Sequence, residues 1–495
     1  MAVRSGAREE CGVVAVSAPG DDVARLCYYA LYALQHRGQE SAGIAVSEGS
    51  RLLVSKEMGL VSQVFDEASL AALPGHLGIG HVRYSTSGSS TWDNAQPAFK
   101  VTPRGEGLAL AHNGNLTNTG QLARADGEAA RGCATDSDLL ATLLAERADR
   151  AGLEEAVAQT CGEATGAFSI VVLTEDGIIG ARDGAGFRPL VIGRLPAGGY
   201  VIASETAALD IVGAHLLREV APGELVTVDA RGLRSRRFAP ARPAFCAFEY
   251  VYLARPDHVE PAAGGGMTSV AATRRRFGEA LAREAPADAD LVVPVPDSGT
   301  AAAAGYAAAA QIPYAEALVK NRYVGRTFIE PSQSLRQLGV RLKLNPLRDV
   351  IDGQRLVVVD DSIVRGNTSR QLVRMLREAG AAEVHLRITS PPVRHPCFYG
   401  VDMATPTELI ASGLDSDEIR RFTGADSLAY LSPGALVAAT RREDDALCTA
   451  CVDGRYPIPI PDEPGVAQAS LVGADGPADA DADADPTAHV WKSAT

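Results

Sequence analysis

The stretch RLVVVDDSIVRGNTSRQLV, Arg355 to Val373, decides the fold of the second half of the chain. Its apolar run Leu356–Val359 predicts a buried strand, because a short unbroken apolar segment is typical of strands covered on both faces. The strand ends on two adjacent carboxylates, Asp360 and Asp361. A short loop, Ser362–Asn367, follows and contains one glycine.

A helix is predicted directly after this loop. Leu372, Val373 and Leu376 form an apolar stripe with helical spacing, and Gly380 is a C-terminal stop. The N–H groups of the loop and the positive end of the helix dipole would face an anion such as phosphate. The preceding carboxylates suit sugar hydroxyls and a divalent cation instead. This pattern predicts a phosphorylated ribose, although an acidic loop after a buried strand also occurs in doubly wound sheets without any ligand.

The whole run VVVDDSIVRGNTS, Val357 to Ser369, is more specific than two adjacent aspartates. It resembles the signature of type I phosphoribosyltransferases, which bind phosphoribosyl pyrophosphate. The resemblance implies binding by Asp360, Asp361, Ser362, Val364, Arg365, Gly366, Asn367 and Thr368.

Composition limits the remaining possibilities. A chain of 495 residues is long enough for two to three domains. A hydrophobic content of 46% and a charged content of 22% are ordinary for a soluble globular protein. The net charge of −14 argues against a surface for nucleic acid. The start MAVRSGAREE has no apolar core, so we expect a cytoplasmic protein without a secretory signal.

The first half of the chain is rich in short strands separated by turns. Helices are predicted near Val23–Leu34 and Asp136–Arg147, and a hairpin is predicted around Gly232. Antiparallel strands with flanking helices indicate a layered α+β domain that ends near Pro240.

Four motifs in this half occur in a fixed order: CGVVAV from Cys11, LQHRGQESAGI from Leu34, GHVRYSTSG from Gly80 and HNGNLTN from His112. Together they resemble the N-terminal-nucleophile glutamine amidotransferases, whose layered αββα domain splits glutamine. The resemblance implies that a leader, residues 1–10, is removed and that Cys11 becomes the first residue. Its α-amine, with a pKa near 8, would then act as the base for its thiol. The thiolate would form a thioester with glutamine and release ammonia.

Further roles follow from the same resemblance. Asn113 and the N–H of Gly114 would stabilise the oxyanion. Arg83 would bind the glutamine carboxylate, Asp136 would bind its ammonium group, and Arg37 with the adjacent glycine would shape the pocket.

Plainer explanations exist for some of these residues. An Asn–Gly pair such as Asn113-Gly114 also makes hairpin turns. Asp136 also suits the start of a helix. We expect Cys27, Cys133 and Cys161 to be ordinary core residues.

A second strand–loop–helix unit precedes the opening stretch. The apolar strand Leu291–Val295 is followed by a Pro-Asp-Ser-Gly-Thr loop and an alanine-rich helix. In type I phosphoribosyltransferases this position holds pyrophosphate, which implies binding by Asp297, Ser298 and Gly299. Ser298, with Asp360 and Asp361, would also belong to a Mg²⁺ site. Without the partner motif, an ordinary helix cap would explain this loop.

The segment Lys320–Arg348 carries seven basic residues and one acid, Glu330. This local reversal of charge indicates a polyanionic ligand, and its composition suggests a lid that excludes water. Lys320 and Arg322 are the predicted ligands. A solvated basic face remains an alternative for Arg341, Lys343 and Arg348.

Four cysteines remain after these assignments. Cys448 and Cys451 form a C-x-x-C pair that suits a metal centre, and such a pair alone is a weak signal. With Cys246 and Cys397, both expected in loops, they match the [4Fe–4S] ligands of the leader-bearing, Bacillus-like branch of glutamine phosphoribosylpyrophosphate amidotransferases. Zinc is the second possibility, because four cysteines alone do not separate it from iron.

The combined motifs resemble the amidophosphoribosyltransferase family from Cys11 to about Pro457. The implied domains are a leader (1–10), a glutamine amidotransferase domain (11–240), an α/β type I phosphoribosyltransferase domain with a mostly parallel sheet (241–464) and a disordered acidic tail (465–495). The implied reaction converts glutamine, phosphoribosyl pyrophosphate and water to 5-phosphoribosylamine, glutamate and pyrophosphate, the first step of purine synthesis. A homotetramer or homodimer inhibited by purine nucleotides would be expected.

Two other hypotheses fit less of the chain. A sugar-phosphate amidotransferase such as glucosamine-phosphate synthase explains the first half but not VVVDDSIVRGNTS. A phosphoribosyl pyrophosphate-sensing regulator predicts a basic DNA-binding domain and no nucleophile. Neither prediction fits, because the chain is acidic overall and Cys11 has its supporting motifs.

Overall fold

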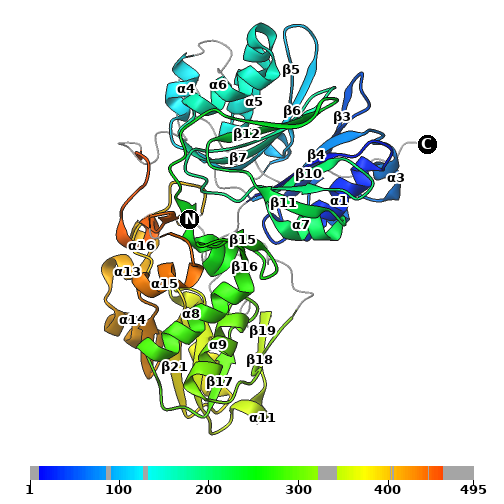
Figure 1. Ribbon diagram of the computed structural model, residues 1–495. Coiled ribbons are helices and arrows are strands. Elements are labelled where there is room, and N and C mark those ends of the chain that lie inside the picture. Colours follow the sequence, from blue (N-terminus) through cyan, green and yellow to red (C-terminus); the bar gives the residue numbers. More distant parts are fainter. Residues whose placement is uncertain are drawn as a thin grey trace, which may run out of the picture.

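The computed structural model describes residues 11–84, 91–125, 132–321, 343–401, 403, 406–443 and 445–460. The chain forms two parts, one above the other in Figure 1, with the first half uppermost. The predicted leader, the predicted acidic tail and residues 322–342 of the predicted lid lie outside the described residues.

Two antiparallel sheets pack face to face in the first half, with an apolar core between them. The first sheet has the strand order β11 (His215–Glu219), β9 (Val191–Arg194), β10 (Tyr200–Ala203), β1 (Gly12–Ser17), β4 (Leu77–Arg83), β2 (Ser41–Ser47) and β3 (Leu52–Met58). The second has the order β13 (Gly232–Arg237), β12 (Glu224–Asp229), β8 (Ile178–Arg182), β7 (Gly166–Leu173), β6 (Gly107–Leu116) and β5 (Ala98–Val101).

Helices cover the outer faces of both sheets (Figure 1). The first sheet carries α1 (Val23–Ala33), α2 (Val61–Val64), α3 (Glu67–Ala71) and α7 (Thr206–Ile211). The second carries α4 (Thr119–Ala125), α5 (Asp136–Ala151) and α6 (Leu153–Glu163). This αββα arrangement confirms the predicted layered α+β domain.

Local sequence explains where the two predicted helices begin. The side chain of Asp22 accepts a hydrogen bond from Arg25 N at 3.0 Å and caps α1. Thr135 caps α5 in the same way, and α5 runs one turn further than predicted. The predicted core cysteines, Cys27, Cys133 and Cys161, are all buried in these helix–sheet layers, as expected.

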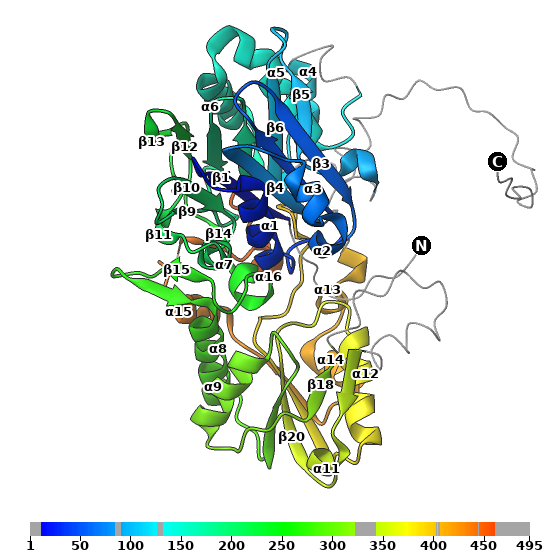
Figure 2. The same ribbon diagram turned by 90° about the vertical axis from the view of Figure 1, so that its right-hand side faces the viewer.

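The second half is built on a parallel sheet with the order β17 (Leu291–Pro294), β20 (Arg355–Asp360), β21 (Glu383–Ile388) and β22 (Ser427–Tyr430). Figure 2 shows α8 (Val270–Glu284) and α9 (Thr300–Ala310) on one side of β20 and α12 (Asn367–Glu378) on the other. Alternate residues of β20 enter the two apolar clusters on these faces, which explains its unbroken apolar sequence. The predicted α/β domain is confirmed.

Short elements surround this sheet. Two antiparallel pairs join β15 (Val259–Pro261) with β16 (Met267–Ser269) and β18 (Leu318–Lys320) with β19 (Leu344–Pro346). The strand β14 (Phe245–Cys246) pairs in parallel with β23 (Leu447–Cys448). The remaining elements are α11 (Arg348–Ile351), α13 (Ile410–Gly413), α14 (Ser416–Thr423), α15 (Pro433–Thr440), α16 (Ala450–Asp453), the 3₁₀ turns Trp92–Asn94 and Pro406–Glu408, and a π-helix, Glu249–Leu253.

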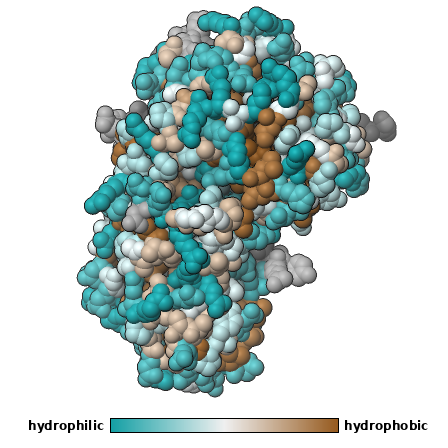
Figure 3. All heavy atoms as spheres, in the orientation of Figure 1, coloured by the Kyte–Doolittle hydropathy of each residue, from teal (hydrophilic) through white to brown (hydrophobic). Residues whose placement is uncertain are grey.

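The surface in Figure 3 is mostly hydrophilic, with a strip of apolar residues on the upper part. In the described part of the chain, none of the helices combines the length and the apolar character needed to cross a bilayer.

Candidate active sites

Cys11 lies immediately before β1 and is 8% exposed. Its Sγ donates to the Tyr84 carbonyl at 3.4 Å and accepts from Tyr84 N at 3.5 Å. Tyr84 directly follows β4, the neighbour of β1 in the sheet. The predicted nucleophile is therefore held at the ends of two central strands of the first sheet.

A hydrogen bond connects these central strands to the strand that carries Asn113 in the second sheet. Val13 of β1 pairs with His81, and His81 Nε2 lies 3.1 Å from the carbonyl of His112. Burial lowers the pKa of His81 to about 3, so its neutral ring donates this bond. The amide of Asn113 is fully buried, and both its Oδ1 and Nδ2 have no hydrogen-bond partner among the described residues. A buried amide without partners is costly, which favours a site that a substrate completes.

Gly114 occupies a position that other residues fit poorly. Its φ is +148°, and an added Cβ would lie 2.0 Å from the carbonyl oxygen of Ala167 on β7. Asn113 and Gly114 both lie inside β6, so the hairpin-turn explanation for this Asn–Gly pair is wrong.

Asp136 is the first residue of α5, as its alternative explanation requires, but it also contacts β6. Its Oδ2 accepts a hydrogen bond from Leu116 N at 3.1 Å, and its Oδ1 accepts from Ser137 N at 2.8 Å. The structure therefore brings Asp136 beside the strand that carries Asn113.

Arg83 ends β4 and is buried, and the predicted pocket turn packs against it. An added Cβ on Gly38 would lie 2.6 Å from the backbone of Val82, so the turn needs glycine for close approach. The Arg37 guanidinium pairs with Glu205 and, at 2.6 Å, with Glu249.

No sequence pattern indicates that Glu205 and Glu249 contact Arg37, because they lie 168 and 212 residues away from it. Burial disfavours the charged form of Glu205, but Arg37 and His36 hold its pKa well below the usual range. Glu249 also pairs with Arg188 at 3.3 Å. These contacts join the pocket turn to the second half of the chain.

The second candidate site lies where β17 and β20 end. These strands are parallel neighbours, so their carboxyl ends meet at one edge of the sheet. Ser298 Oγ donates to Asp361 Oδ2 at 2.5 Å, and Ser362 Oγ donates to Asp361 Oδ1 at 2.5 Å. The two predicted loops are therefore in direct contact.

Asp360 and Asp361 are both buried. Burial, and then the charge of Asp361, raises the pKa of Asp360 well above its usual range. Burial also raises the pKa of Asp361, although hydrogen bonds from Ser298 and Ser362 oppose this. A divalent cation would favour ionisation of both groups. These oxygen donors fit Mg²⁺.

Backbone geometry shapes both loops. An added Cβ on Gly299 would lie 2.4 Å from the Val359 carbonyl, and Gly366 has a φ of +75° just before α12. The Val364 carbonyl accepts from Ile410 N at 2.9 Å. The loop residues therefore curve toward the start of α12, whose first two residues are the predicted ligands Asn367 and Thr368.

Two of the predicted basic ligands are found in ion pairs. Arg365 Nη2 contacts Glu408 at 3.0 Å, while its Nε and Nη1 have no hydrogen-bond partner among the described residues. Lys320 Nζ contacts Asp297 at 2.5 Å. Pairing of β18 with β19 brings the two ends of the predicted lid together, whereas Arg322 lies outside the described residues.

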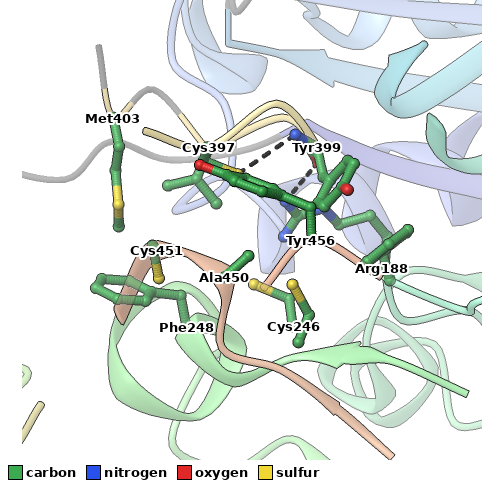
Figure 4. A pocket seen from close by; sticks show the side chains of 12 residues that line it. Arg188, Cys246, Phe248, Cys397, Tyr399, Met403, Ala450, Cys451 and Tyr456 are labelled. Atoms are coloured by element: carbon green, nitrogen blue, oxygen red, sulfur yellow. Dashed lines mark hydrogen bonds between the residues drawn. The ribbon is translucent and has the colours of Figure 1, made fainter. Parts of the chain in front are cut away.

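The four remaining cysteines, Cys246, Cys397, Cys448 and Cys451, line one apolar cavity (Figure 4). Cys246 pairs in register with Cys448 on two short parallel strands, so the predicted loop at Cys246 is a strand instead. Burial raises the pKa of Cys448 to about 12. Burial, followed by the three other thiols, raises the pKa of Cys451 well above its usual range.

Four thiols in an apolar cavity form a donor set that fits a soft metal centre, because a bound cation would stabilise the thiolates. Within the residues that the structure describes, no group of three or more His, Cys, Asp or Glu side chains is arranged to hold a metal ion. All four sulfur-bearing side chains line the same cavity.

Comparisons with known protein families assign a domain to each half of the chain. A glutamine amidotransferase domain model matches residues 81–210, and a phosphoribosyl transferase domain model matches residues 269–392. The chain is 57% identical to the amidophosphoribosyltransferase of Mycobacterium tuberculosis, over 92% of this chain and 88% of that protein. It is 45% identical to the enzyme of the same name from Bacillus subtilis, over 93% and 96%.

Solved structures give the same result for the fold. Glutamine phosphoribosylpyrophosphate amidotransferase from B. subtilis, complexed with ADP and GMP, is 43% identical and superposes with a TM-score of 0.84, covering 93% of this chain and all of that one. The chain therefore belongs to the amidophosphoribosyltransferase family, as an enzyme that uses glutamine and phosphoribosyl pyrophosphate in the first step of purine biosynthesis.

Proposed function

We propose that Cys11 attacks the side-chain amide of glutamine and that the released ammonia reacts inside the protein with phosphoribosyl pyrophosphate. The carbon–nitrogen bond breaks as the thioester forms, and water then releases glutamate. Asn113 and the N–H of Gly114 stabilise the oxyanion. The observation that carries this proposal is the buried amide of Asn113, which has no partner among the described residues and follows His112, whose carbonyl binds His81 of β4.

Replacement of the nucleophile tests this proposal. Cys11→Ala should abolish formation of phosphoribosylamine from glutamine and should keep the activity with free ammonia, since the second site is untouched. A C11A protein that still used glutamine would exclude Cys11 as the nucleophile.

We further propose that residues 1–10 are removed, so that the α-amine of Cys11 becomes the base for its own thiol. The resemblance of the four ordered motifs supports this step. Intact-mass analysis of the native protein would reveal it, and a mass that retained all ten residues in active enzyme would contradict it.

For glutamine itself, we propose that Arg83 binds the α-carboxylate and Asp136 binds the α-ammonium group. Both residues are buried near β6, at the end of β4 and at the start of α5. Arg37 contributes indirectly, because its guanidinium is held by Glu205 and Glu249 while its turn packs on β4. Arg83→Lys and Asp136→Asn should raise KM for glutamine more than they lower kcat.

We propose that the second site holds phosphoribosyl pyrophosphate between its two loops. Asp360 and Asp361 face the ribose hydroxyls and, with Ser298, would hold Mg²⁺, which would stabilise charge on the departing pyrophosphate. The other proposed phosphoribosyl pyrophosphate-binding residues are Asp297, Ser298, Gly299, Lys320, Arg322, Ser362, Val364, Arg365, Gly366, Asn367 and Thr368. The contact of Ser298 with Asp361 supports this assignment, since it joins the two loops.

At the four cysteines we propose a [4Fe–4S] cluster, as in the iron–sulfur branch of the family. The four cysteines line one cavity, and their positions match the cluster ligands of that branch, which supports the cluster over zinc. Metal analysis and visible absorption of anaerobically purified protein would test this. Zinc without iron would exclude it.

Three further proposals concern the whole molecule. We propose domain boundaries near residues 240 and 464, a homodimer or homotetramer, and inhibition by purine nucleotides. The B. subtilis structure with ADP and GMP supports the last of these. We also propose a cytoplasmic location, because reactive thiols require a reducing compartment. Light scattering and inhibition assays with each nucleotide would test assembly and regulation.

A further inference from the structure

One side chain connects the oxyanion strand to the loop that carries Cys397. Asn115 follows Gly114 on β6, and its Nδ2 donates to the carbonyl of Phe398 at 3.0 Å. The two residues are 283 positions apart and belong to opposite halves of the chain. A second, longer contact joins Asn115 Nδ2 to the Leu116 carbonyl at 3.3 Å.

The partner loop, Cys397–Tyr399, is ordered by its own contacts. Tyr399 N donates to Cys397 Sγ at 3.4 Å, Arg188 Nη2 donates to the Tyr399 carbonyl at 2.7 Å, and Tyr399 OH donates to the Ile458 carbonyl at 2.7 Å. Figure 4 shows Cys397 and Tyr399 beside the cavity that Cys246 and Cys451 also line. Because of this order, the Phe398 carbonyl is a fixed acceptor for Asn115.

The two residues that flank Asn115 in β6 are also restrained. Leu116 N is bound by Asp136, and the Cα of Gly114 lies too close to the Ala167 carbonyl to carry a side chain. Gly114 pairs with Phe168 of β7, and its φ of +148° is open mainly to glycine. The hydrogen bond of Asn115 therefore restrains the residue next to the oxyanion donor.

We propose that Asn115 is a positioning residue for the glutaminase reaction, which holds the oxyanion donors of β6 in place by its hydrogen bond to the Cys397–Tyr399 loop. This inference rests on the oxyanion roles of Asn113 and Gly114 proposed above. It makes the glutamine site depend on a loop of the other half of the chain. An oxyanion donor acts mainly in the transition state, so a displaced donor lowers kcat and leaves glutamine binding nearly unchanged.

The test uses the full-length enzyme with two substitutions at this position. Asn115→Asp keeps the size of the side chain but puts a carboxylate against the Phe398 carbonyl, and Asn115→Ala removes the contact. Asn118→Ala is the matched control, because Asn118 makes a similar amide-to-carbonyl bond, to Glu163 at 2.9 Å, within the first half alone.

We expect N115D and N115A to lower kcat for glutamine hydrolysis 10- to 100-fold while KM changes less than about threefold, on the scale of a weakened oxyanion contact. Activity with free ammonia and iron content should equal those of the wild type, and N118A should keep kcat. Glutamate γ-semialdehyde serves as a second probe. The Cys11 thiol adds to its aldehyde carbon, and the aldehyde oxygen then occupies the oxyanion site. In N115D and N115A, the inhibition constant of this aldehyde should rise as kcat falls, whereas inhibition by glutamate should not change.

Hydrogen exchange gives a readout independent of activity. Peptides that cover residues 108–116 and 397–401 should exchange faster in N115A than in N118A. A wild-type kcat in N115D and N115A, or a loss shared with the ammonia reaction, would overturn the positioning role. Failure of the oxyanion assignment is distinguishable, because Asn113→Ala would then leave both glutamine hydrolysis and aldehyde binding intact.

Discussion

The buried carboxylate of Glu249 offers the sharpest test of how the two halves are joined. Its oxygens contact Arg37 at 2.6 Å and Arg188 at 3.3 Å, and all three side chains are at most 1% exposed. Glu249→Ala would leave two guanidinium groups buried with fewer acceptors. Breaking a buried pair in this way costs about 3–5 kcal/mol. Glu249→Gln keeps the shape and one acceptor oxygen, so its cost should be smaller, about 2 kcal/mol.

Glu67 is a matched control for this prediction. It contacts Arg25 at 2.8 Å, a similar distance, but its side chain is 81% exposed. Solvent screens an exposed pair of this kind, so Glu67→Ala should have little effect on the free energy of unfolding. Urea unfolding followed by far-UV circular dichroism would give the three free energies of unfolding. If E249A were no more destabilising than E67A, burial would not control the strength of this network and the reasoning would be refuted.

Three more predictions follow from single residues. Gly114→Ala should lower glutamine-dependent kcat about 10²- to 10³-fold and spare the ammonia reaction, because the added Cβ displaces the oxyanion strand; Gly105→Ala, also at positive φ but in open space, should leave kcat unchanged. Burial opposes ionisation of Glu260, but Arg442 and then His258 lower its pKa from 4.5 to about 2. The ionised Glu260 carboxylate therefore stabilises the folded protein fully above about pH 4.5, and this stabilisation is lost as the pH falls toward 2. The difference in unfolding free energy between wild type and Glu260→Gln, up to about 3 kcal/mol at pH 7, should therefore shrink in acid titrations, and a constant difference would contradict this. Asp361→Asn should lower kcat/KM for phosphoribosyl pyrophosphate about 10- to 100-fold with ammonia as nitrogen donor and leave glutamine hydrolysis unchanged; equal losses in both assays would argue against a local role.

Much of each site follows from short stretches of sequence. The strand, acidic pair, glycine loop and helix of Arg355–Val373 are consecutive, so periodicity and turn chemistry predict them, and β20 and α12 appear where expected. Cys11 and the Asn113-Gly114 pair were recognisable because each lies in a specific motif. The Asn–Gly pair also shows the limit of local reasoning, since only the pairing of β6 with β7 excludes a turn.

The sequence by itself determined the two folds and was enough to predict the nucleophile and both anion loops, since these depend on neighbours along the chain. Tertiary structure alone decided that Glu249 binds Arg37, that Asn115 binds the Phe398 carbonyl and that Cys246 lies beside Cys448. These partners are about 200 or more residues apart, and a contact at that separation leaves no periodic signal in either segment. Burial then fixes their strength, because removal of water makes each charge and each amide depend on its partner.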